Sequence, residues 1–318
     1  MIRKLTIITV CALASLASLR AAELTPLRVG YNNWVGFVAF FVAQEKGFFK
    51  EAGLEVQPKT FAAPGDGLVP LLSGDLDIHL STVDATILRS AAAPDSLKVV
   101  ALVDTSAGAD AVLGSPAVKT PADLKGKRVA VTLGECNEVL LVKALKSAGL
   151  TEADVTMVNM DPDAAGTALK AGSVDAAVTW EPWISQLVGA GNANTVFTTK
   201  EAPNVLTDCV VITKATAKDR TTAVQGFLQA MDRATKFTRE NPDEAAAIAG
   251  QALEVDPSEI TAMLGKVEIY DLAASKAAME GPALQAAADL LAFFQQKGSV
   301  APSTSIEGIF LPDFAAQP

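Results

Sequence analysis

The sequence predicts an α/β protein with two similar lobes, each built on a mixed, mainly parallel sheet, and two crossovers of the chain between the lobes. The first observation behind this prediction is a motif that occurs twice, in residues 71–85 and in residues 169–183. Both segments read as a helix end, a glycine, an apolar strand and a turn, and they align Asp77 with Asp175. The second observation is that the elements before each motif repeat in the same order. Two copies of a unit too small to be a whole enzyme predict two lobes that face a shared cleft.

The first copy belongs to lobe one, which we expect to contain residues 23–107 and 205–318. Short apolar runs alternate with helical patterns, and Gly, Pro and Asp mark every connection. The expected elements are strand 27–32, helix 38–52, strand 54–61, a helix ending near Ser73, strand 77–81, a helix from about Val83, and strand 97–103.

The second copy forms lobe two, residues 108–204. It opens with a short turn that has Pro121 at the first helical position and Gly126 as its stop. The expected elements are strand 127–132, helix 136–148, strand 154–159, helix 163–171, strand 174–179, helix 181–190 and strand 195–198.

A second crossing near residues 202–207 returns the chain to lobe one. Two crossings form a hinge that can open and close through a few backbone dihedrals. The rest is predicted to be strand 208–213 followed only by helices, at 221–240, 242–252, 257–264 and 281–297.

Residues 1–22 are predicted to be a secretory signal peptide. Arg3 and Lys4 form its basic start, residues 5–17 form its apolar part, and small residues follow as cleavage points. The apolar part is too short to span a bilayer. We therefore expect an exported, periplasmic protein.

The composition excludes several classes of protein. The net charge of −10 gives a surface that repels nucleic acid and anionic membranes. Only Cys136 and Cys209 follow the signal peptide, which is too few for a disulfide framework, and no Cys/His spacing is typical of zinc. We expect no transmembrane helix, no metal and no cofactor.

Five loops are the predicted ligand-binding loops, because ligands of open parallel sheets bind beyond the carboxyl ends of the strands. They are residues 32–36, 81–84, 104–106, 134–137 and 180–183. The candidate ligand-binding residues in them are Asn33, Trp34, Thr82, Asp84, Asp104, Glu135, Cys136, Asn137, Trp180 and Glu181.

The tryptophans of these loops have two interpretations. Trp34 follows an apolar strand beside Gly36, where it is either a lid over a ligand or a plug between helix and sheet. Trp180 and Trp183 flank a proline that starts a helix, so at least one should pack inward. We favour the ligand role for Trp34 and the core role for Trp183.

The acidic residues also have two interpretations. Asp84 and Glu181 each follow a strand and precede a helix, where an acid is an ordinary cap. Their occurrence at equivalent turns of two lobes, together with Asp104 and Glu135, favours a binding role.

No residue pattern predicts catalysis. His79, the only histidine, lies in the middle of a strand and is interpreted as a sheet residue. Cys136 has no histidine at a readable spacing and is expected to be at most a mildly activated thiol. Phosphate-binding glycine loops and nucleophile elbows are absent from the sequence.

Four segments together resemble the periplasmic solute-binding proteins of the nitrate/sulfonate/taurine class of ABC importers. They are residues 30–34, 42–56, 123–131 and 174–183. The resemblance implies the type II periplasmic binding protein fold, closure on a small-molecule solute, and delivery to an ABC permease in the inner membrane. We also expect a monomer.

The charge of the predicted loops does not suit the anionic ligands that are usual for that class. An anion-binding protein should offer Arg or Lys, whereas these loops contain Asp84, Asp104, Glu135 and Glu181 and no base. We therefore expect a small cationic or amide-like solute, such as a guanidinium, an amine or an amide. The alternatives are a sulfonate, taurine or nitrate binder, and a thiamine-pyrimidine synthase-like enzyme or pyrimidine binder.

Overall fold

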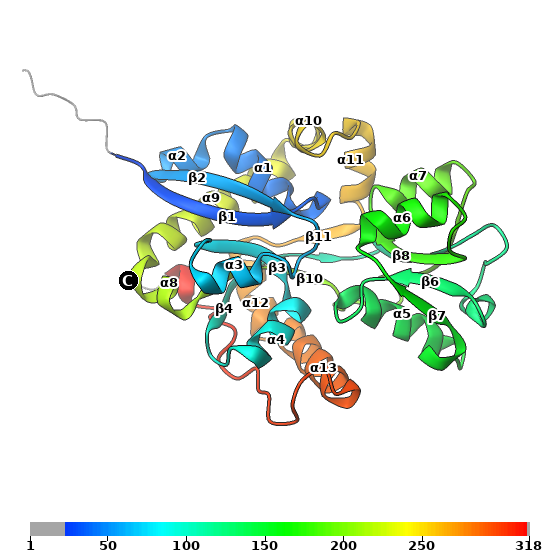
Figure 1. The fold of residues 1–318 in the computed structure, drawn as a ribbon. Coiled ribbons are helices and arrows are strands. Elements are labelled where there is room, and N and C mark those ends of the chain that lie inside the picture. The colour runs from blue at the N-terminus through cyan, green and yellow to red at the C-terminus, as the bar shows by residue number, and fades with distance from the viewer. Residues whose placement is uncertain (1–22, 317–318) are drawn as a thin grey trace, which may run out of the picture.

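The computed structural model describes residues 23–316. The predicted signal peptide lies outside the described residues. Two separate sheets, each covered by helices, confirm the predicted α/β class (Figure 1). We call the unit around the six-stranded sheet lobe one and the unit around the five-stranded sheet lobe two.

The sheet of lobe one has the strand order β11-β4-β10-β3-β1-β2. β1 pairs in parallel with β2 and β3, whereas β10 is antiparallel to both β3 and β4. The strands are β1 Thr25–Asn32, β2 Leu54–Phe61, β3 Ile78–Thr82, β4 Leu97–Ser106, β10 Thr207–Thr213 and β11 Val267–Ile269.

Helices cover both faces of this sheet. α1 packs on α9 and α10 on one face, and α4 packs on β3, β10 and α13 on the other (Figure 1). The helices are α1 Val38–Glu45, α2 Phe48–Glu51, α3 Leu68–Ser73, α4 Val83–Ala92, α8 Lys214–Asp219, α9 Thr221–Glu240, α10 Pro242–Leu253, α11 Pro257–Leu264, α12 Leu272–Met279 and α13 Pro282–Lys297.

The sheet of lobe two has the strand order β7-β6-β8-β5-β9. β6 is parallel to β7 and β8, and β5 is antiparallel to β8 and β9. The elements are β5 Asp110–Gly114, β6 Arg128–Val131, α5 Cys136–Ser147, β7 Thr156–Asn159, α6 Pro162–Lys170, β8 Ala176–Trp180, α7 Trp183–Gly189 and β9 Asn194–Thr198.

The two sheets have the same design. In each sheet, the first strand of the repeat lies between the second strand and the third strand. A strand that has just crossed from the other lobe pairs antiparallel with the third strand. That strand is β10 in lobe one and β5 in lobe two. The repeat that the sequence suggests is therefore a repeat of structure.

The aligned aspartates make the same contact in both copies. Asp77 Oδ2 accepts a hydrogen bond from the backbone N–H of Arg28 at 2.8 Å, and Asp175 Oδ2 accepts one from that of Arg128 at 2.9 Å. Each bond fixes the residue before the third strand against the first strand of its lobe. The repeated aspartate is thus explained by strand pairing and not by ligand binding.

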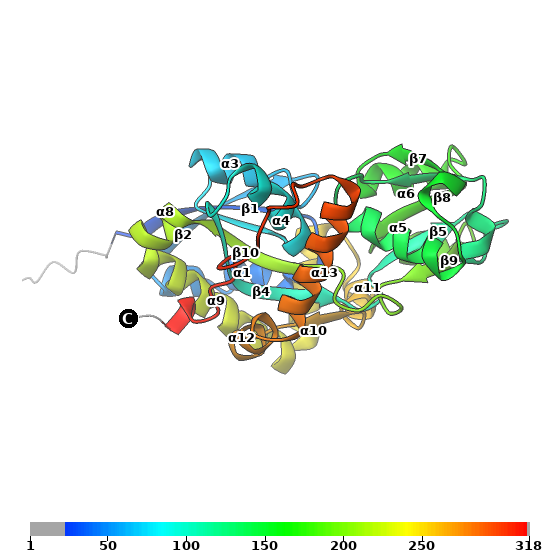
Figure 2. The ribbon, with the colours of Figure 1, turned by 90° about the horizontal axis from the view of Figure 1, so that it is seen from below.

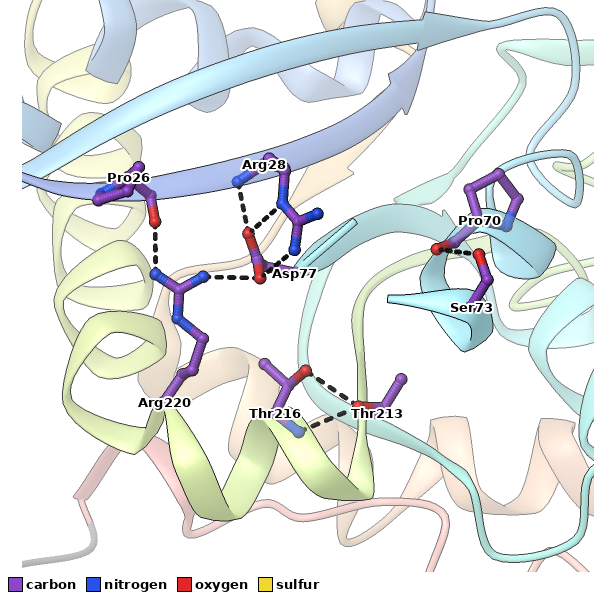
Figure 3. A network of polar contacts seen from close by, with 8 residues as sticks. All are labelled: Pro26, Arg28, Pro70, Ser73, Asp77, Thr213, Thr216 and Arg220. Atoms are coloured by element: carbon purple, nitrogen blue, oxygen red, sulfur yellow. Dashed lines mark hydrogen bonds and ion pairs between the residues drawn. The ribbon is translucent and has the colours of Figure 1, made fainter. Parts of the chain in front are cut away.

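Asp77 has additional partners that Asp175 lacks. Its carboxylate also receives Nε and Nη2 of Arg28 at 3.0 and 2.9 Å, and Nη1 of Arg220 lies 2.6 Å away (Figure 3). Arg220 also donates to the carbonyl of Pro26, so the start of α9 is joined to β1. Burial raises the pKa of Asp77, but the bonds from Arg28 and Arg220 outweigh it and lower that pKa below its usual value.

Several predicted elements need correction. The helix expected at 38–52 is two helices, because Gly47 has a left-handed backbone with a φ of 74° between them. β5 was not predicted, and the tail predicted to be only helical contains the short strand β11. Both strands depend on partners distant in the chain, β8 and β4 respectively.

The hinge consists of two neighbouring segments that connect the lobes. Ser106 Oγ and Thr199 Oγ1 are 2.8 Å apart, and the backbone N–H of Gly108 donates to Thr199 Oγ1 at 2.7 Å. In the view from below, α13 of lobe one lies next to lobe two (Figure 2). Lys297 at its end forms ion pairs with Glu138 and Glu152 of lobe two.

Within residues 23–316 no helix combines the length and the apolar character that crossing a bilayer requires.

The aspartate contacts predict a difference in stability between the two lobes. We expect Asp77→Ala to lower the free energy of unfolding by about 2 kcal/mol, and the matched change Asp175→Ala by about 1 kcal/mol, because Asp77 bonds two arginines as well as a backbone N–H. Urea unfolding followed by circular dichroism measures both.

The pH dependence of this difference follows from the lowered pKa of Asp77. Its contribution is present above the unfolded pKa of about 4 and disappears as the pH falls through the lower folded pKa. If Asp77→Ala and Asp175→Ala lowered the free energy of unfolding equally at pH 7, the role assigned to the arginines would be contradicted.

Candidate functional site

Six acidic side chains from both lobes gather where the strands of the two sheets end and the chain crosses between lobes. All are buried except Glu135, which is partly buried. We call this set the carboxylate row; it consists of Asp84, Asp104, Asp110, Glu135, Glu181 and Asp208.

Lobe one contributes three members of the row. Asp84 lies in the first turn of α4, directly after β3. Asp104 lies near the end of β4, and Asp208 lies near the start of β10, opposite Asp104 in the antiparallel register. Because β10 runs antiparallel, its beginning lies at the same edge of the sheet as the end of β4.

The other three members belong to lobe two. Asp110 is the first residue of β5 and lies opposite Trp180 in the register. Glu135 precedes the first turn of α5, and Glu181 directly follows β8. Asp110 and Asp208 occupy equivalent places in the two lobes, since each lies near the start of the strand that enters from the other lobe.

Trp34 contacts the row at Asp104, near the end of β4. Its Nε1 donates to both oxygens of Asp104, at 3.2 Å each, and its ring centre lies 6.3 Å from that of Trp180. The backbone of Gly36 leaves the space for this contact, because a Cβ there would lie 2.2 Å from Asp104 Oδ2. Trp34 therefore joins a row member to Trp180, which belongs to the other lobe.

Glu181 has protein partners for both of its carboxylate oxygens. It accepts hydrogen bonds from the backbone N–H and the hydroxyl of Ser185, each at 3.0 Å, so it caps the start of α7. It also forms an ion pair with Lys266 of lobe one. Among residues 23–316, Lys266 is the only cation paired with a member of the row.

Three members of the row carry buried oxygens that no protein group satisfies. Both carboxylate oxygens of Asp84, both of Asp110, and Oε2 of Glu135 lack a hydrogen-bond partner in the described chain. The Nδ2 of Asn137, two residues after Glu135, is also buried without a partner, and the Thr82 hydroxyl, two residues before Asp84, makes no well-formed hydrogen bond but lies close enough to Asp84 to lower its pKa in part against burial. A buried unsatisfied polar group costs about 1–3 kcal/mol, and more if it is charged. These groups make the row the candidate binding site of the described chain.

Burial raises the pKa values of five members of the row. It raises the pKa of Asp104 to about 7, that of Asp110 to about 7 and that of Glu135 to about 8. Burial, with the neighbouring charge of Asp104, also raises the pKa of Asp208 well above its usual range, and burial raises that of Asp84. The row therefore holds protons at neutral pH that a bound cation can displace.

Several residues proposed from the sequence lie differently in the structure. Asn33 is exposed, whereas its neighbour Asn32 is buried with an unsatisfied Oδ1. Trp183 is only partly buried; it packs over Gly166 and donates to Asp163 at 2.9 Å, away from the row. Trp180 is buried against Trp34.

The two residues considered for catalysis have structural environments. The Cys136 thiol is not activated, because burial, together with the negative charge of Asp84 and Glu135, raises its pKa well above the usual value. His79 lies within β3 as expected, and its Nε2 lies 2.8 Å from the carbonyl oxygen of Pro64.

Sequence reasoning missed Asp110 and Asp208. Both begin strands, and the loop rule searches only after strands. The available signal was the two crossings: a strand that enters from the other lobe and pairs antiparallel has its first residues at the edge of the sheet where the parallel strands end. In residues 23–316 no three His, Cys, Asp or Glu side chains are close enough to hold a metal ion.

Comparison with known proteins places the chain among bacterial binding proteins. The family model described as NMT1/THI5 like matches residues 34–245. The taurine-binding periplasmic protein of Escherichia coli is 26% identical over 266 residues, which cover 80% of this chain and 81% of that protein. An Escherichia coli protein named for binding aliphatic sulfonates is 28% identical over 264 residues, 80% of this chain and 81% of that one.

Solved structures show the same fold. The alkanesulfonate-binding protein of Xanthomonas axonopodis pv. citri, bound to MOPS, superposes with a TM-score of 0.78 at 22% identity, covering 92% of this chain and 99% of that one. The periplasmic nitrate-binding protein of Synechocystis PCC 6803 gives a TM-score of 0.76 at 17% identity, covering 93% of this chain and 89% of that one.

The raised pKa values predict that the protein without solute loses stability as the pH rises from 6.5 to 8.5. The unfolded carboxyl groups are ionised throughout this range, whereas the folded groups release protons with pKa values of about 7 and about 8. The folded state thus binds more protons, and the free energy of unfolding falls with pH. The range starts at 6.5 so that the buried, neutral His79, with its lowered pKa, contributes little.

Thermal unfolding in buffers across this range measures the effect. Asp110→Asn should flatten the dependence, and the exposed control Asp289→Asn should leave it unchanged. A melting temperature that is constant or rises between pH 6.5 and 8.5 would contradict the assignment.

Proposed function

Because the chain belongs to the NMT1/THI5-like family, we propose that it is the periplasmic solute-binding component of an ABC importer and captures a small cationic or amide-like nitrogenous solute between its lobes. The solute class includes guanidinium compounds, amines and amides. An ABC permease in the inner membrane would receive the solute, and the protein would act as a monomer.

The observation that carries the proposed charge of the solute is the set of unsatisfied carboxylates. Asp84 and Asp110 are each about 1% exposed, and neither carboxylate accepts a well-formed hydrogen bond from the chain; the Thr82 hydroxyl and the Ser106 hydroxyl lie close enough only to lower the pKa of Asp84 and that of Asp110 in part against burial. Two charges 4 Å apart repel by about 4 kcal/mol at an effective dielectric constant of 20. A cation placed among these groups removes that repulsion and supplies the missing donors, whereas an anion increases it.

The relatives named for binding taurine and aliphatic sulfonates make an anion the main alternative. An anion site needs Arg, Lys or an array of donors. In the described chain the only cation paired with the row is Lys266, and its ammonium group is already bound to Glu181. This chain would therefore use the scaffold of those relatives with the opposite electrostatic preference.

A pyrimidine is a second candidate solute. Carboxyl groups with pKa values near 7 or 8 can be protonated at neutral pH and then donate as well as accept hydrogen bonds. Such groups, beside two tryptophans, fit an aminopyrimidine ring. A Haemophilus influenzae relative named for thiamine biosynthesis is 28% identical over 276 residues, covering 82% of this chain and 83% of that protein.

Closure of the lobes would complete the site. The unsatisfied oxygens of the row are inaccessible to solvent, so a solute can reach them only if the lobes separate. Two sets of ion pairs between the lobes, Lys266 with Glu181 and Lys297 with Glu138 and Glu152, hold them together. The solute would add the attraction that lets Asp84 and Glu135 approach each other.

The first prediction of this proposal is selectivity. In isothermal titration at pH 8, methylguanidinium or a short alkylamine should bind the mature protein, and ethanesulfonate, taurine, nitrate and sulfate should bind at least about tenfold more weakly. An aminopyrimidine is titrated in the same series. Tight sulfonate binding with no response to any cation would refute the proposed charge, and binding of the pyrimidine alone would favour the second candidate.

The second prediction concerns Asp110. Asp110→Asn keeps the shape of the side chain and removes a buried charge, so we expect the affinity for the cation to fall by about 10- to 100-fold, or about 1–3 kcal/mol. The stability without solute should stay equal or increase at pH 8, because repulsion within the row decreases. Asp289→Asn on exposed α13 is the control. A variant that binds normally would exclude Asp110 from the site.

A further inference from the structure

We infer that the loop of residues 62–67 in lobe one orients Glu135 of lobe two by direct contact, and that His79 and Ser81 are the positioning residues that hold this loop. The loop, which we call the Pro64 loop, connects β2 to α3. The contact between the lobes goes beyond the proposed function, and only the role of Glu135 toward the solute rests on that function.

Two side chains of β3 bind one carbonyl group of the Pro64 loop. The hydroxyl of Ser81 donates to the carbonyl oxygen of Pro64 at 2.7 Å, and Nε2 of His79 lies 2.8 Å from the same oxygen. Because a carbonyl oxygen only accepts, Nε2 carries the proton of the neutral ring. The ring also packs on Gly67, where a Cβ would lie 2.3 Å from Cε1 of His79. β3 therefore fixes the loop at two places.

Lobe two contains the same bond at the equivalent place in the repeat. The hydroxyl of Thr179 in β8 donates to the carbonyl oxygen of Pro162 at 2.8 Å. In each lobe the hydroxyl residue and the proline are 17 positions apart in the sequence. Both lobes therefore use their third strand to hold the segment that follows their second strand.

His79 gives lobe one a donor that lobe two does not have, and the path of the chain explains the difference. In lobe two α6 starts at Pro162 itself, so the hydrogen bonds of the helix fix this segment. In lobe one α3 starts only at Leu68, after the loop. The position equivalent to His79 is occupied in lobe two by Ala177, which has no polar side chain.

The Pro64 loop meets the other lobe at Gly65. A Cβ on Gly65 would lie 2.6 Å from Oε1 of Glu135. Burial raises the pKa of Glu135, and the backbone N–H of Gly65 opposes this rise as a hydrogen-bond donor. The equivalent position in lobe two is Asp163, which accepts a hydrogen bond at 2.9 Å from Trp183 of its own lobe. The two equivalent segments thus differ in their partners, and only the one in lobe one contacts the row across the boundary.

This contact leaves one oxygen of Glu135 for the solute. Oε1 lies against Gly65, whereas Oε2 is buried and has no hydrogen-bond partner among residues 23–316. A carboxylate that is held at one oxygen presents the other in a fixed direction, which reduces the loss of side-chain freedom on binding. Gly65 is not among the glycines with a left-handed backbone. The close approach of Glu135, and not the backbone conformation, therefore requires glycine here.

The test measures the ratio of closed to open protein in the absence of solute. Spin labels are attached to the mature protein at two exposed positions, through Gln57→Cys in lobe one and Lys170→Cys in lobe two. The native Cys136 and Cys209 are both buried and should not take up the label. Double electron–electron resonance then gives the populations of the short and the long distance between the lobes.

Gly65→Ala should lower the ratio of closed to open protein about fivefold, because its methyl group displaces Oε1 of Glu135. In protein that also carries Glu135→Ala, the same substitution should change the ratio less than twofold, because the methyl group then meets no carboxylate. A general defect of the loop would instead lower the ratio equally in both backgrounds.

Ser81→Ala tests the positioning role in the same two backgrounds. It should lower the ratio about threefold where Glu135 is present and leave it nearly unchanged in the Glu135→Ala protein. The matched control Thr179→Ala removes the equivalent bond of lobe two, and its effect should be the same in both backgrounds. Circular dichroism and melting temperature confirm that the variants fold.

The outcomes separate this inference from the proposed function. A wild-type protein that is wholly open without solute, or equal effects of Gly65→Ala in the two backgrounds, would refute the contact. In isothermal titration with methylguanidinium, Gly65→Ala should bind about fivefold more weakly than the wild type, and equal binding would refute the orientation of Oε2 by the loop. Failure of methylguanidinium and of every other cation to bind would refute the proposed function, whereas the spin labels test the contact without any solute.

Discussion

Two strands that change lobes, β5 and β10, determine how the rest of the site is arranged. Each enters the opposite sheet antiparallel to its neighbours, so its first residues lie at the edge where the parallel strands end. Asp110 and Asp208 are thereby placed among acids that follow strands, such as Asp104. This topology concentrates carboxylates at the boundary between the lobes, and only Lys266 of the described chain pairs with one of them. The unbalanced charge is a constraint that folding alone does not relieve.

The constraint links stability to binding. Buried carboxylates with few donors raise the free energy of the closed, unliganded protein, and their pKa values rise because burial disfavours the charged form. Under the proposed function, a solute that supplies positive charge would replace those protons. Strain of this kind at a binding site is the usual reason that substitutions there can stabilise a protein while they remove its function. The ion pairs of Lys266 and Lys297 hold the lobes together from positions outside the unsatisfied group.

The scaffold of this protein depends mainly on backbone pairing, whereas the proposed selectivity depends on side chains at the strand ends. The strand order, the repeated aspartate bonds at Asp77 and Asp175, and the hinge contacts of Thr199 all concern backbone pairing. The aspartate bonds do not involve the row, whereas the backbone N–H of Thr199 donates to the carbonyl oxygen of Asp110, a member of the row, at 3.1 Å. Under the proposed function, this framework is kept while the residues at the strand ends set the sign of the charge that the cleft accepts. Relatives named for sulfonate and taurine binding share the framework at 26–28% identity, which leaves ample room for such a change.

The sequence by itself determined the α/β class, the repeat, most strands and helices, and four of the six acids of the row, because these depend on local hydrophobic patterns and on residues that follow strands. Tertiary structure decided the rest. β5 and β11 exist only through pairing with β8 and β4, and Asp110 and Asp208 reach the row only because their strands run antiparallel. Packing also buries Asn32 and leaves its neighbour Asn33 exposed. It gives Glu181 an ion pair and a hydrogen bond at the start of α7, whereas Asp84 accepts no well-formed hydrogen bond. Burial and partners belong to the packed chain, since a pattern along the sequence specifies neither strand order nor which charges meet.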